Sequence, residues 1–187
     1  KAPGIHGLVP DDRLIRDDWD VFLSSPLVVD EMVYFGSGDG SLYALNAISG
    51  EELWTFHTTN VVHSSPAYGY GNIYFGSWDA NFYALDAKTG EEIWRFKTGE
   101  DSTNFNQVGI QGSPMIADST VYFGCRDSRL YALNAITGQE LWQFSAEGSW
   151  IVCTPTLYKE KILVGTSDSH RFLALNARTG KRIYETD

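Results

Sequence analysis

The chain has 187 residues, of which 43% are hydrophobic and 14% aromatic, so it can bury a sizeable core and disorder is not expected. Its net charge of -10 and its lack of any basic run argue against a nucleic-acid partner, because phosphate binding needs clustered Lys and Arg. No apolar run approaches the ~20 residues that a membrane-spanning helix needs, so we expect no direct insertion into a membrane.

Residues 1–23 come first in the chain and match none of the segments that follow. We expect the stretch DDRLIRDDWDVF within them to supply a closing strand, an edge cover or a linker. The first residues contain no apolar core of the kind that a signal peptide carries.

Residues 24–187 contain one unit written four times, with copies at about 24–63, 64–111, 112–152 and 153–187. The prolines that open the copies are 40, 48 and 41 residues apart, and the middle step carries the insertion GEDSTNFNQVGI. Self-similarity at such a period indicates a repeat architecture. The recurring positions are Pro26, Pro66, Pro114 and Pro155; Gly36, Gly76, Gly124 and Gly165; and Trp54, Trp94 and Trp142, with Tyr184 in the fourth copy.

Each copy reads as four short strands in chain order. In the first copy these are PLVVD, MVYFGS, SLYALNA and EELWTFH. Both faces of the third strand are partly apolar, which is typical of a strand buried between neighbours. The glycine before the fourth strand, such as Gly50, stands where a hairpin turn needs a positive φ. Four antiparallel strands in a unit of about 40 residues predict an all-β fold of β-propeller blades.

The pattern A-L-(N/D)-A-x-T-G-x-x-x-W resembles the repeat of the pyrroloquinoline quinone (PQQ) family, and the resemblance runs from about Ser24 to Asp187. It implies that Trp54, Trp94 and Trp142 pack flat between adjacent blades. Propellers of this family usually have seven or eight blades, so four blades would make half a ring. The chain would then be a fragment, a half-ring completed by a second copy in a homodimer, or an open arc.

The segment GSGDGS at 36–41 looks like a phosphate-binding loop, but the other copies carry GSWDAN, GCRDSR and GTSDSH in the same slot. No helix follows, as phosphate binding would require, so we predict a hairpin turn. An aspartate recurs in it, and we expect that side chain to cap the turn by hydrogen bonds to the backbone. These aspartates are Asp39, Asp79, Asp127 and Asp168.

Strand direction brings three features of each blade to one face of the propeller: the turn after the second strand, the Ser-Pro segment and the loop to the next blade. Binding residues collect on loops at one face of a rigid scaffold. The aromatic, cationic and amide side chains found there suit a planar or anionic ligand. We therefore predict a ligand or partner face, made by His63, Trp78, Gln111, Arg126, Trp150 and His170.

The same geometry places the only two cysteines, Cys125 and Cys153, at one end of neighbouring blades. Their spacing fits no metal motif. We expect two buried thiols, with a disulfide between them as the alternative.

The quinoprotein dehydrogenases that the repeat resembles carry an adjacent cysteine pair over the cofactor and an acidic set around calcium. Here the two cysteines are 28 residues apart, and no acidic set can be carried over. We therefore expect no catalytic residue, no metal and no cofactor, and a non-enzymatic binding or scaffold module that holds a protein partner or small ligand through its loop face. The alternatives are a fragment of a PQQ-dependent dehydrogenase, with PQQ and calcium, and the sensor ectodomain of a membrane receptor or kinase. The resemblance implies a periplasmic or extracellular location.

Overall fold

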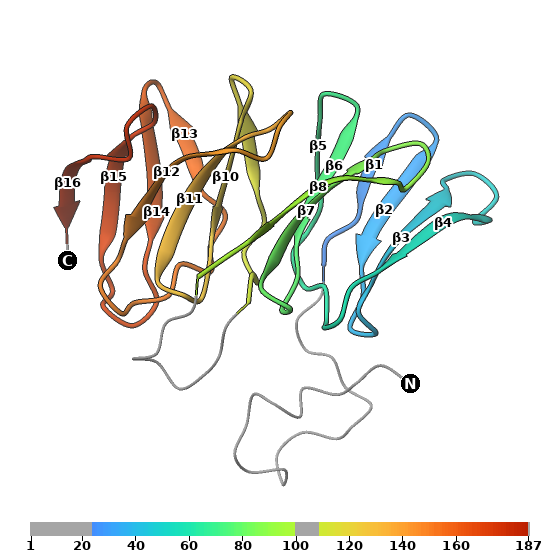
Figure 1. Cartoon of the computed structure of the whole chain (residues 1–187), viewed down its shortest axis with the longest axis horizontal. Helices are drawn as coiled ribbons and strands as arrows, with labels where there is room; N and C mark the ends of the chain where they lie inside the picture. Colours follow the sequence, from blue (N-terminus) through green and yellow to red (C-terminus); the bar gives the residue numbers. More distant parts are fainter. Residues whose placement is uncertain (1–23, 100–108, 187) are drawn as a thin grey trace, which may run out of the picture.

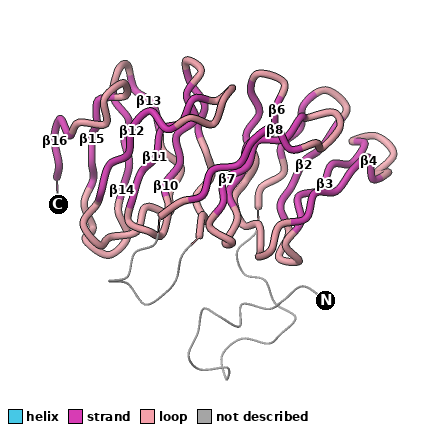
Figure 2. Tube along the Cα trace, in the orientation of Figure 1, coloured by secondary structure: helices cyan, strands magenta, loops and turns pink. Residues whose placement is uncertain are grey.

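The computed structural model describes residues 24–99 and 109–186, which form a row of four separate sheets packed side by side (Figure 1). Every sheet has four strands whose spatial order is their order in the chain. The described residues are strand, turn and loop (Figure 2), and none of them belongs to a helix that could cross a membrane. The predicted all-β fold of propeller blades is confirmed. Residues 1–23, and residues 100–108 of the insertion, lie outside the described residues.

Each blade occupies one of the four repeats. The first contains β1 (Leu27–Val29), β2 (Met32–Gly36), β3 (Ser41–Asn46) and β4 (Glu52–His57). The second contains β5 (Ala67–Gly69), β6 (Asn72–Gly76), β7 (Asn81–Asp86) and β8 (Glu92–Lys97). The third contains β9 (Met115–Ala117), β10 (Thr120–Gly124), β11 (Arg129–Asn134) and β12 (Glu140–Ser145). The fourth contains β13 (Thr156–Tyr158), β14 (Lys161–Gly165), β15 (Phe172–Asn176) and β16 (Arg182–Thr186).

All pairings within a blade are antiparallel, and the outermost strand carries a bulge at the same place each time. In the first blade Ala44 faces Trp54, and the next pair is Leu45 with Glu52, so the residue between them is skipped. The same shift recurs in the other three blades. A bulge re-aims the side chains beside it, and here the tryptophan next to the bulge reaches the following blade.

One carbonyl at each blade junction accepts two side-chain hydrogen bonds. At the first junction, the Tyr34 hydroxyl donates to the Ala87 carbonyl at 3.0 Å and Trp54 Nε1 donates to the same oxygen at 3.1 Å. This shared acceptor ties the second and fourth strands of one blade to the next blade. The equivalent pairs are Tyr74 and Trp94 on Ala135, at 2.8 and 3.1 Å, and Tyr122 and Trp142 on Ala177, at 3.2 and 2.9 Å.

The indole ring packs against the turn glycine of the next blade. Gly90 has a φ of 73°, and a Cβ there would lie 2.7 Å from the Trp54 ring. Gly138 repeats this arrangement under Trp94, with a Cβ distance of 2.6 Å. The glycine is therefore needed both for its positive φ and for the close approach of the tryptophan. Three apolar clusters, one at each junction, complete the packing.

The recurrent aspartate caps its turn in the first three blades, as predicted, but Asp168 of the fourth blade does not. Asp39 Oδ1 accepts the Ser41 backbone N–H at 2.9 Å, and its other oxygen accepts the Tyr43 hydroxyl at 2.6 Å. Burial opposes ionisation of Asp39, but hydrogen bonds from Tyr43 and Ser41 prevail and lower its pKa. The turns of the first three blades are thereby fixed to the third strand of their own blade. In the fourth blade Asp168 instead accepts the Trp150 backbone N–H at 3.4 Å and the Ser167 hydroxyl at 2.7 Å.

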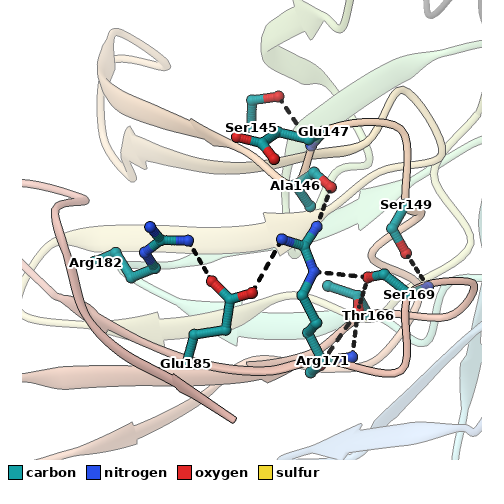
Figure 3. Close-up of polar contacts among 9 residues, drawn as sticks. All are labelled: Ser145, Ala146, Glu147, Ser149, Thr166, Ser169, Arg171, Arg182 and Glu185. Atoms are coloured by element: carbon teal, nitrogen blue, oxygen red, sulfur yellow. Dashed lines mark hydrogen bonds and ion pairs between the residues drawn. The ribbon is translucent and has the colours of Figure 1, made fainter. Parts of the chain in front are cut away.

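The fourth blade is held to the third by an arginine (Figure 3). Arg171 donates to the Ala146 carbonyl at 2.7 Å and to the Ser169 hydroxyl at 2.9 Å, and it pairs with Glu185 at 3.1 Å. Glu185 also contacts Arg182, and the hydrogen bond from Arg171 is the largest cause that lowers the pKa of Glu185. This network connects β15 and β16 to the loop that follows β12.

Candidate functional site

We call the face that carries the inter-blade segments and the turns between the second and third strands the loop face. It is rigid because each inter-blade segment is hydrogen-bonded to the turns of both blades that it joins. Ile110 donates its backbone N–H to the Ser77 carbonyl of the preceding blade at 3.0 Å. Its neighbour Gly109 accepts the Arg126 backbone N–H of the following blade at 3.1 Å. The other two junctions repeat both bonds. The turns and inter-blade loops thus share one face, at the bottom edge in Figure 1.

Arg126 lies between two indole rings on this face. Its guanidinium carbon is 4.3 Å from the centre of the Trp78 ring and 4.1 Å from the centre of the Trp150 ring. A cation over the face of an indole is attracted by the quadrupole of the ring. Trp78, Arg126 and Trp150, which we call the loop-face stack, come from three segments: the turns of the second and third blades and the segment that joins the third blade to the fourth.

A glycine makes the loop-face stack possible. Trp78 and Arg126 occupy the same slot in the turns of neighbouring blades, and Gly109 lies between those two turns. A Cβ at Gly109 would lie 2.7 Å from the Trp78 Cα, and the φ of 137° also favours glycine. With no side chain at Gly109, the indole and the guanidinium meet. At the next junction the equivalent position is Trp150, which contacts Arg126 from the other blade.

The stack contains two buried donors that have no acceptor. Trp78 is only 5% exposed, and its Nε1 atom, like that of Trp150, is buried without a hydrogen-bond partner in residues 24–99 and 109–186. The His63 ring packs against the edge of Trp78, with ring centres 5.5 Å apart and an interplanar angle of 77°. A buried N–H without an acceptor is costly, so these two indoles mark a place suited to an acceptor from outside.

The stack is cationic in a chain that is otherwise acidic. Burial lowers the pKa of the Arg126 guanidinium, and the nearby carboxylate of Asp168 opposes that effect. Asp168 is itself held by its backbone N–H, which donates to Ser149 Oγ at 3.0 Å. Arginine stays protonated in proteins, so the stack presents a fixed positive charge between two aromatic rings.

Four of the six residues predicted for the ligand face therefore gather: His63, Trp78, Arg126 and Trp150. Gln111 is half-buried in the loop beside Gly109, and His170 is exposed in the turn between β14 and β15, where its φ is 54°. Neither side chain makes a hydrogen bond, ion pair or ring contact with the stack in the described part of the chain. A binding role for all six residues stays a prediction.

The structure holds both cysteines as free thiols. Cys125 is fully buried, and burial raises the pKa of its thiol to about 12. Cys153 is exposed, so the expectation of two buried thiols is wrong for this residue, and the alternative of a disulfide is not formed either. Cys153 lies just before the fourth blade. At the equivalent position of an earlier repeat the next blade covers the side chain, but no described blade follows the fourth.

The side chains of residues 24–99 and 109–186 do not by themselves form a site for PQQ with calcium. Residues 24–99 and 109–186 contain no group of three or more His, Cys, Asp or Glu side chains that could hold a metal ion. The two tryptophans that could support a planar cofactor both contact Arg126 already. The cysteines are not adjacent, and one of them is buried with a raised pKa.

A hollow of about 580 Å³ opens on the opposite side of the third and fourth blades. Residues of both charges line it, among them Asp118, Lys159, Glu160 and Arg178. No residue predicted from the sequence as a ligand contact lies in it. The signals that sequence reasoning missed on the loop face are Gly109 and Asp168, whose importance appears only when neighbouring blades are stacked.

Comparison with known proteins agrees with the fold. A family model described as outer membrane protein assembly factor BamB matches residues 13–149 and 129–187. A comparison with curated proteins gives no match.

Among solved structures, the chain is similar to two quinohemoprotein alcohol dehydrogenases. The one from Pseudomonas putida HK5 has a TM-score of 0.72 and 22% identity, over 90% of this chain and 35% of that chain. The one from Comamonas testosteroni has a TM-score of 0.75 and 20% identity, over 89% and 35%. BamB from Moraxella catarrhalis has a TM-score of 0.66 and 18% identity, over 91% and 63%.

The chain spans about a third of those two dehydrogenases and less than two thirds of BamB. At these identities the structural likeness shows the fold alone. The family match covers nearly the whole chain, and together with four blades joined by tryptophan it places the chain in the PQQ-repeat β-propeller family described as outer membrane protein assembly factor BamB.

Proposed function

We propose that this chain is a non-enzymatic binding module that holds a protein partner on its loop face through Trp78, Arg126 and Trp150. The observation that carries the proposal is the pair of buried indole N–H groups beside one arginine, neither of which has an acceptor among the described residues. A group buried in this way costs about 1–3 kcal/mol. Both Nε1 atoms are covered in the free chain, so a partner that offers an oxygen to each indole relieves that cost when binding moves the covering side chains aside.

The chemistry of the stack defines what a partner must offer. Two N–H donors and a guanidinium are all donors, so the matching surface consists of acceptors: main-chain carbonyls or an isolated carboxylate. The net charge of -10 disfavours a strongly acidic partner, because most of the molecule would repel it. An extended, uncharged protein segment with free carbonyls fits these conditions.

The family description supports one class of partner. The matched family is described as an outer membrane protein assembly factor, and a solved relative is BamB of Moraxella catarrhalis. We extend this to the chain and propose that the partner is an outer membrane protein that has not yet folded, or a protein that assembles it. The proposed location is the periplasm.

The test uses the full chain, immobilised, and an outer membrane β-barrel protein diluted from urea as the probe. Trp78→Phe and Trp150→Phe keep an aromatic ring, remove the donor and shrink the ring system, and Arg126→Gln removes the charge. We expect each Trp variant to weaken binding about threefold to tenfold, the worth of one neutral hydrogen bond, and Arg126→Gln to weaken it by tenfold or more.

Arg178→Gln is the matched control, because Arg178 is an exposed arginine that lines the hollow on the opposite side. It should leave the affinity unchanged. Equal affinity for all four variants and the parent chain would show that the loop-face stack takes no part in binding.

A fragment of a PQQ-dependent dehydrogenase is the second candidate, favoured by the fold shared with the two quinohemoprotein alcohol dehydrogenases. Added PQQ with calcium would then raise the unfolding temperature, because a ligand that binds only the native state stabilises it. A shift of the unfolding temperature that Arg126→Gln abolishes would support this candidate over a protein-binding module.

A further inference from the structure

The hollow between the third and fourth blades has an apolar interior. Its buried lining residues are Tyr122, Trp142 and Ala177, and the first two spend their polar hydrogens on the Ala177 carbonyl. Leu141 and Leu157 also line it, and Leu141 is 51% exposed. Ligand sites of about 300–1,000 Å³ commonly combine such an apolar lining with a few polar groups. At about 580 Å³ the hollow has room for a large apolar side chain and part of the segment that bears it.

A short residue at the start of β10 contributes to this space. Thr120 lines the hollow, and the same position of the repeat holds Met32 in the first blade and Asn72 in the second. Both of these longer side chains lie against the hydroxyl of the junction tyrosine. Met32 Sδ accepts from the Tyr34 hydroxyl at 3.3 Å, and Asn72 Nδ2 donates to the Tyr74 hydroxyl at 3.4 Å. Threonine is shorter than methionine or asparagine, so it fills less of the corresponding space in the third blade.

The fourth blade, which forms one side of the hollow, is basic in an otherwise acidic chain. Residues 153–187 contain six Lys and Arg against four Asp and Glu, whereas residues 24–152 contain five against fifteen. Part of this reversal falls at the start of the outer strand, where the first two blades have two glutamates and the fourth has Lys181 and Arg182. Salt screens exposed charges beyond about 8 Å at physiological ionic strength. The acids of the first two blades therefore do little to cancel this local positive charge.

Two cations of the fourth blade are available to a ligand at the hollow. Arg178 lines it, and Lys181 follows in the same turn. Both side chains are exposed, and neither forms an ion pair with any described residue. Arg182, by contrast, already contacts Glu185 (Figure 3). Arg178 and Lys181 can therefore pair with carboxylates from outside.

The rim of the hollow also carries acceptors. Asp118 of the third blade and Glu160 of the fourth line it, and both are exposed. These carboxylates would repel a multiply charged inorganic anion. They accept hydrogen bonds, which the backbone N–H groups of a peptide supply. A rim with both kinds of group therefore suits a peptide that carries carboxylates better than it suits free phosphate.

We infer that the hollow between the third and fourth blades binds an acidic protein segment. An apolar side chain of that segment enters between Leu141 and Leu157, and its carboxylates pair with Arg178 and Lys181. This site is separate from the loop-face stack. The loop-face partner proposed above is an uncharged segment, which has no carboxylate for Arg178, so the two sites select different ligands.

The test adds a synthetic peptide, acetyl-Glu-Asp-Leu-Asp-Glu-amide, to the full chain and follows the backbone signals by ¹H–¹⁵N NMR. The signals of Thr120, Lys159 and Arg178 should shift and saturate. A peptide with serine in place of leucine should bind about tenfold or more weakly, because it lacks the apolar side chain. A peptide with lysine in place of each acid should bind at least as weakly. Equal binding of the acidic and lysine peptides would overturn the inference.

Substitutions copied from other blades test the site with little risk to the fold. Thr120→Met, which copies the first blade, should fill part of the hollow and weaken binding about tenfold or more. Thr120→Asn, which copies the second blade, is the alternative in case the first variant fails to fold. Arg178→Ile and Lys181→Glu, which also copy the first blade, should each weaken binding about twofold to fivefold.

Lys88→Ile is the matched control, because Lys88 is exposed and occupies the position of Arg178 in the second blade, away from the hollow. It should leave the affinity for the acidic peptide unchanged. An affinity that also stays unchanged in Thr120→Met and Arg178→Ile would show that the peptide binds elsewhere.

Discussion

Because two side chains donate to one carbonyl at each blade junction, we expect the loss of one donor to cost less stability than the loss of both. At the second junction, Tyr74 and Trp94 both donate to the Ala135 carbonyl, at 2.8 and 3.1 Å, and Ala135 is 0% exposed. Tyr74→Phe removes one donor and leaves the oxygen satisfied by the indole. The cost should be about 1 kcal/mol, the net worth of one neutral hydrogen bond, because the other contact of this hydroxyl, from Asn72 Nδ2, is long at 3.4 Å.

The same substitution should cost more when the indole is already gone. In a Trp94→Phe background, Tyr74→Phe leaves the buried carbonyl with no side-chain donor, and the cost of an unsatisfied buried acceptor is about 1–3 kcal/mol. The double-mutant cycle should therefore show a coupling of about 1 kcal/mol. Because the Trp94→Phe loss of packing occurs in both halves of the cycle, it cancels.

Urea unfolding of the four chains gives these free energies, provided that the slope with denaturant is unchanged. Tyr184→Phe is the control, because the Tyr184 hydroxyl makes no hydrogen bond to any described residue; its cost should stay within about 0.5 kcal/mol. If Tyr74→Phe costs the same with and without Trp94, the two donors do not share one acceptor in the way that the structure indicates.

Two further predictions concern thiols and pH. In the native chain a thiol reagent at pH 8 should modify Cys153 quickly and Cys125 very slowly, because burial raises the pKa of Cys125 to about 12; denaturation should release the second thiol, and a count of none would instead indicate a disulfide. Backbone hydrogen bonds from Thr89 and Lys88 lower the pKa of Asp86, so the stability it contributes is present above pH 3.8 and is lost as the pH falls through the lower folded-state value. Asp86→Asn, which copies the residue of the other three blades, should flatten this acid limb of a thermal-unfolding profile; an unchanged limb would show that Asp86 does not contribute to it.

The blades could be predicted from the sequence because their determinants are local and repeated. The turn glycines, the aspartate caps such as Asp39 and the Trp beside the bulge each act within one unit or between one unit and the next. The repeat period therefore makes these residues recognisable in the sequence. Strand direction also sufficed to bring Trp78, Arg126 and Trp150 to one face.

The stacking of those three residues could not be predicted, because it depends on how the slots of different repeats interleave. Trp78 and Arg126 come from turns, Trp150 from an inter-blade segment, and the space between the first two exists because Gly109 has no side chain. The exposure of Cys153 was missed for a related reason. Ser64 is buried at the same position of the second repeat, because the next blade covers it. The exposure of the side chain at this position therefore depends on whether a neighbouring blade follows, and not on the sequence of its own repeat.

The most direct test of the loop-face proposal follows the indole N–H signals by ¹H–¹⁵N NMR as the urea-diluted β-barrel protein is added. Trp54, Trp94 and Trp142 already donate to carbonyls at 2.9–3.1 Å and serve as internal controls whose signals should not move. The signals of Trp78 and Trp150 should shift downfield and gain protection from solvent exchange as they acquire acceptors. Binding that saturates while both of these signals stay in place would contradict the account.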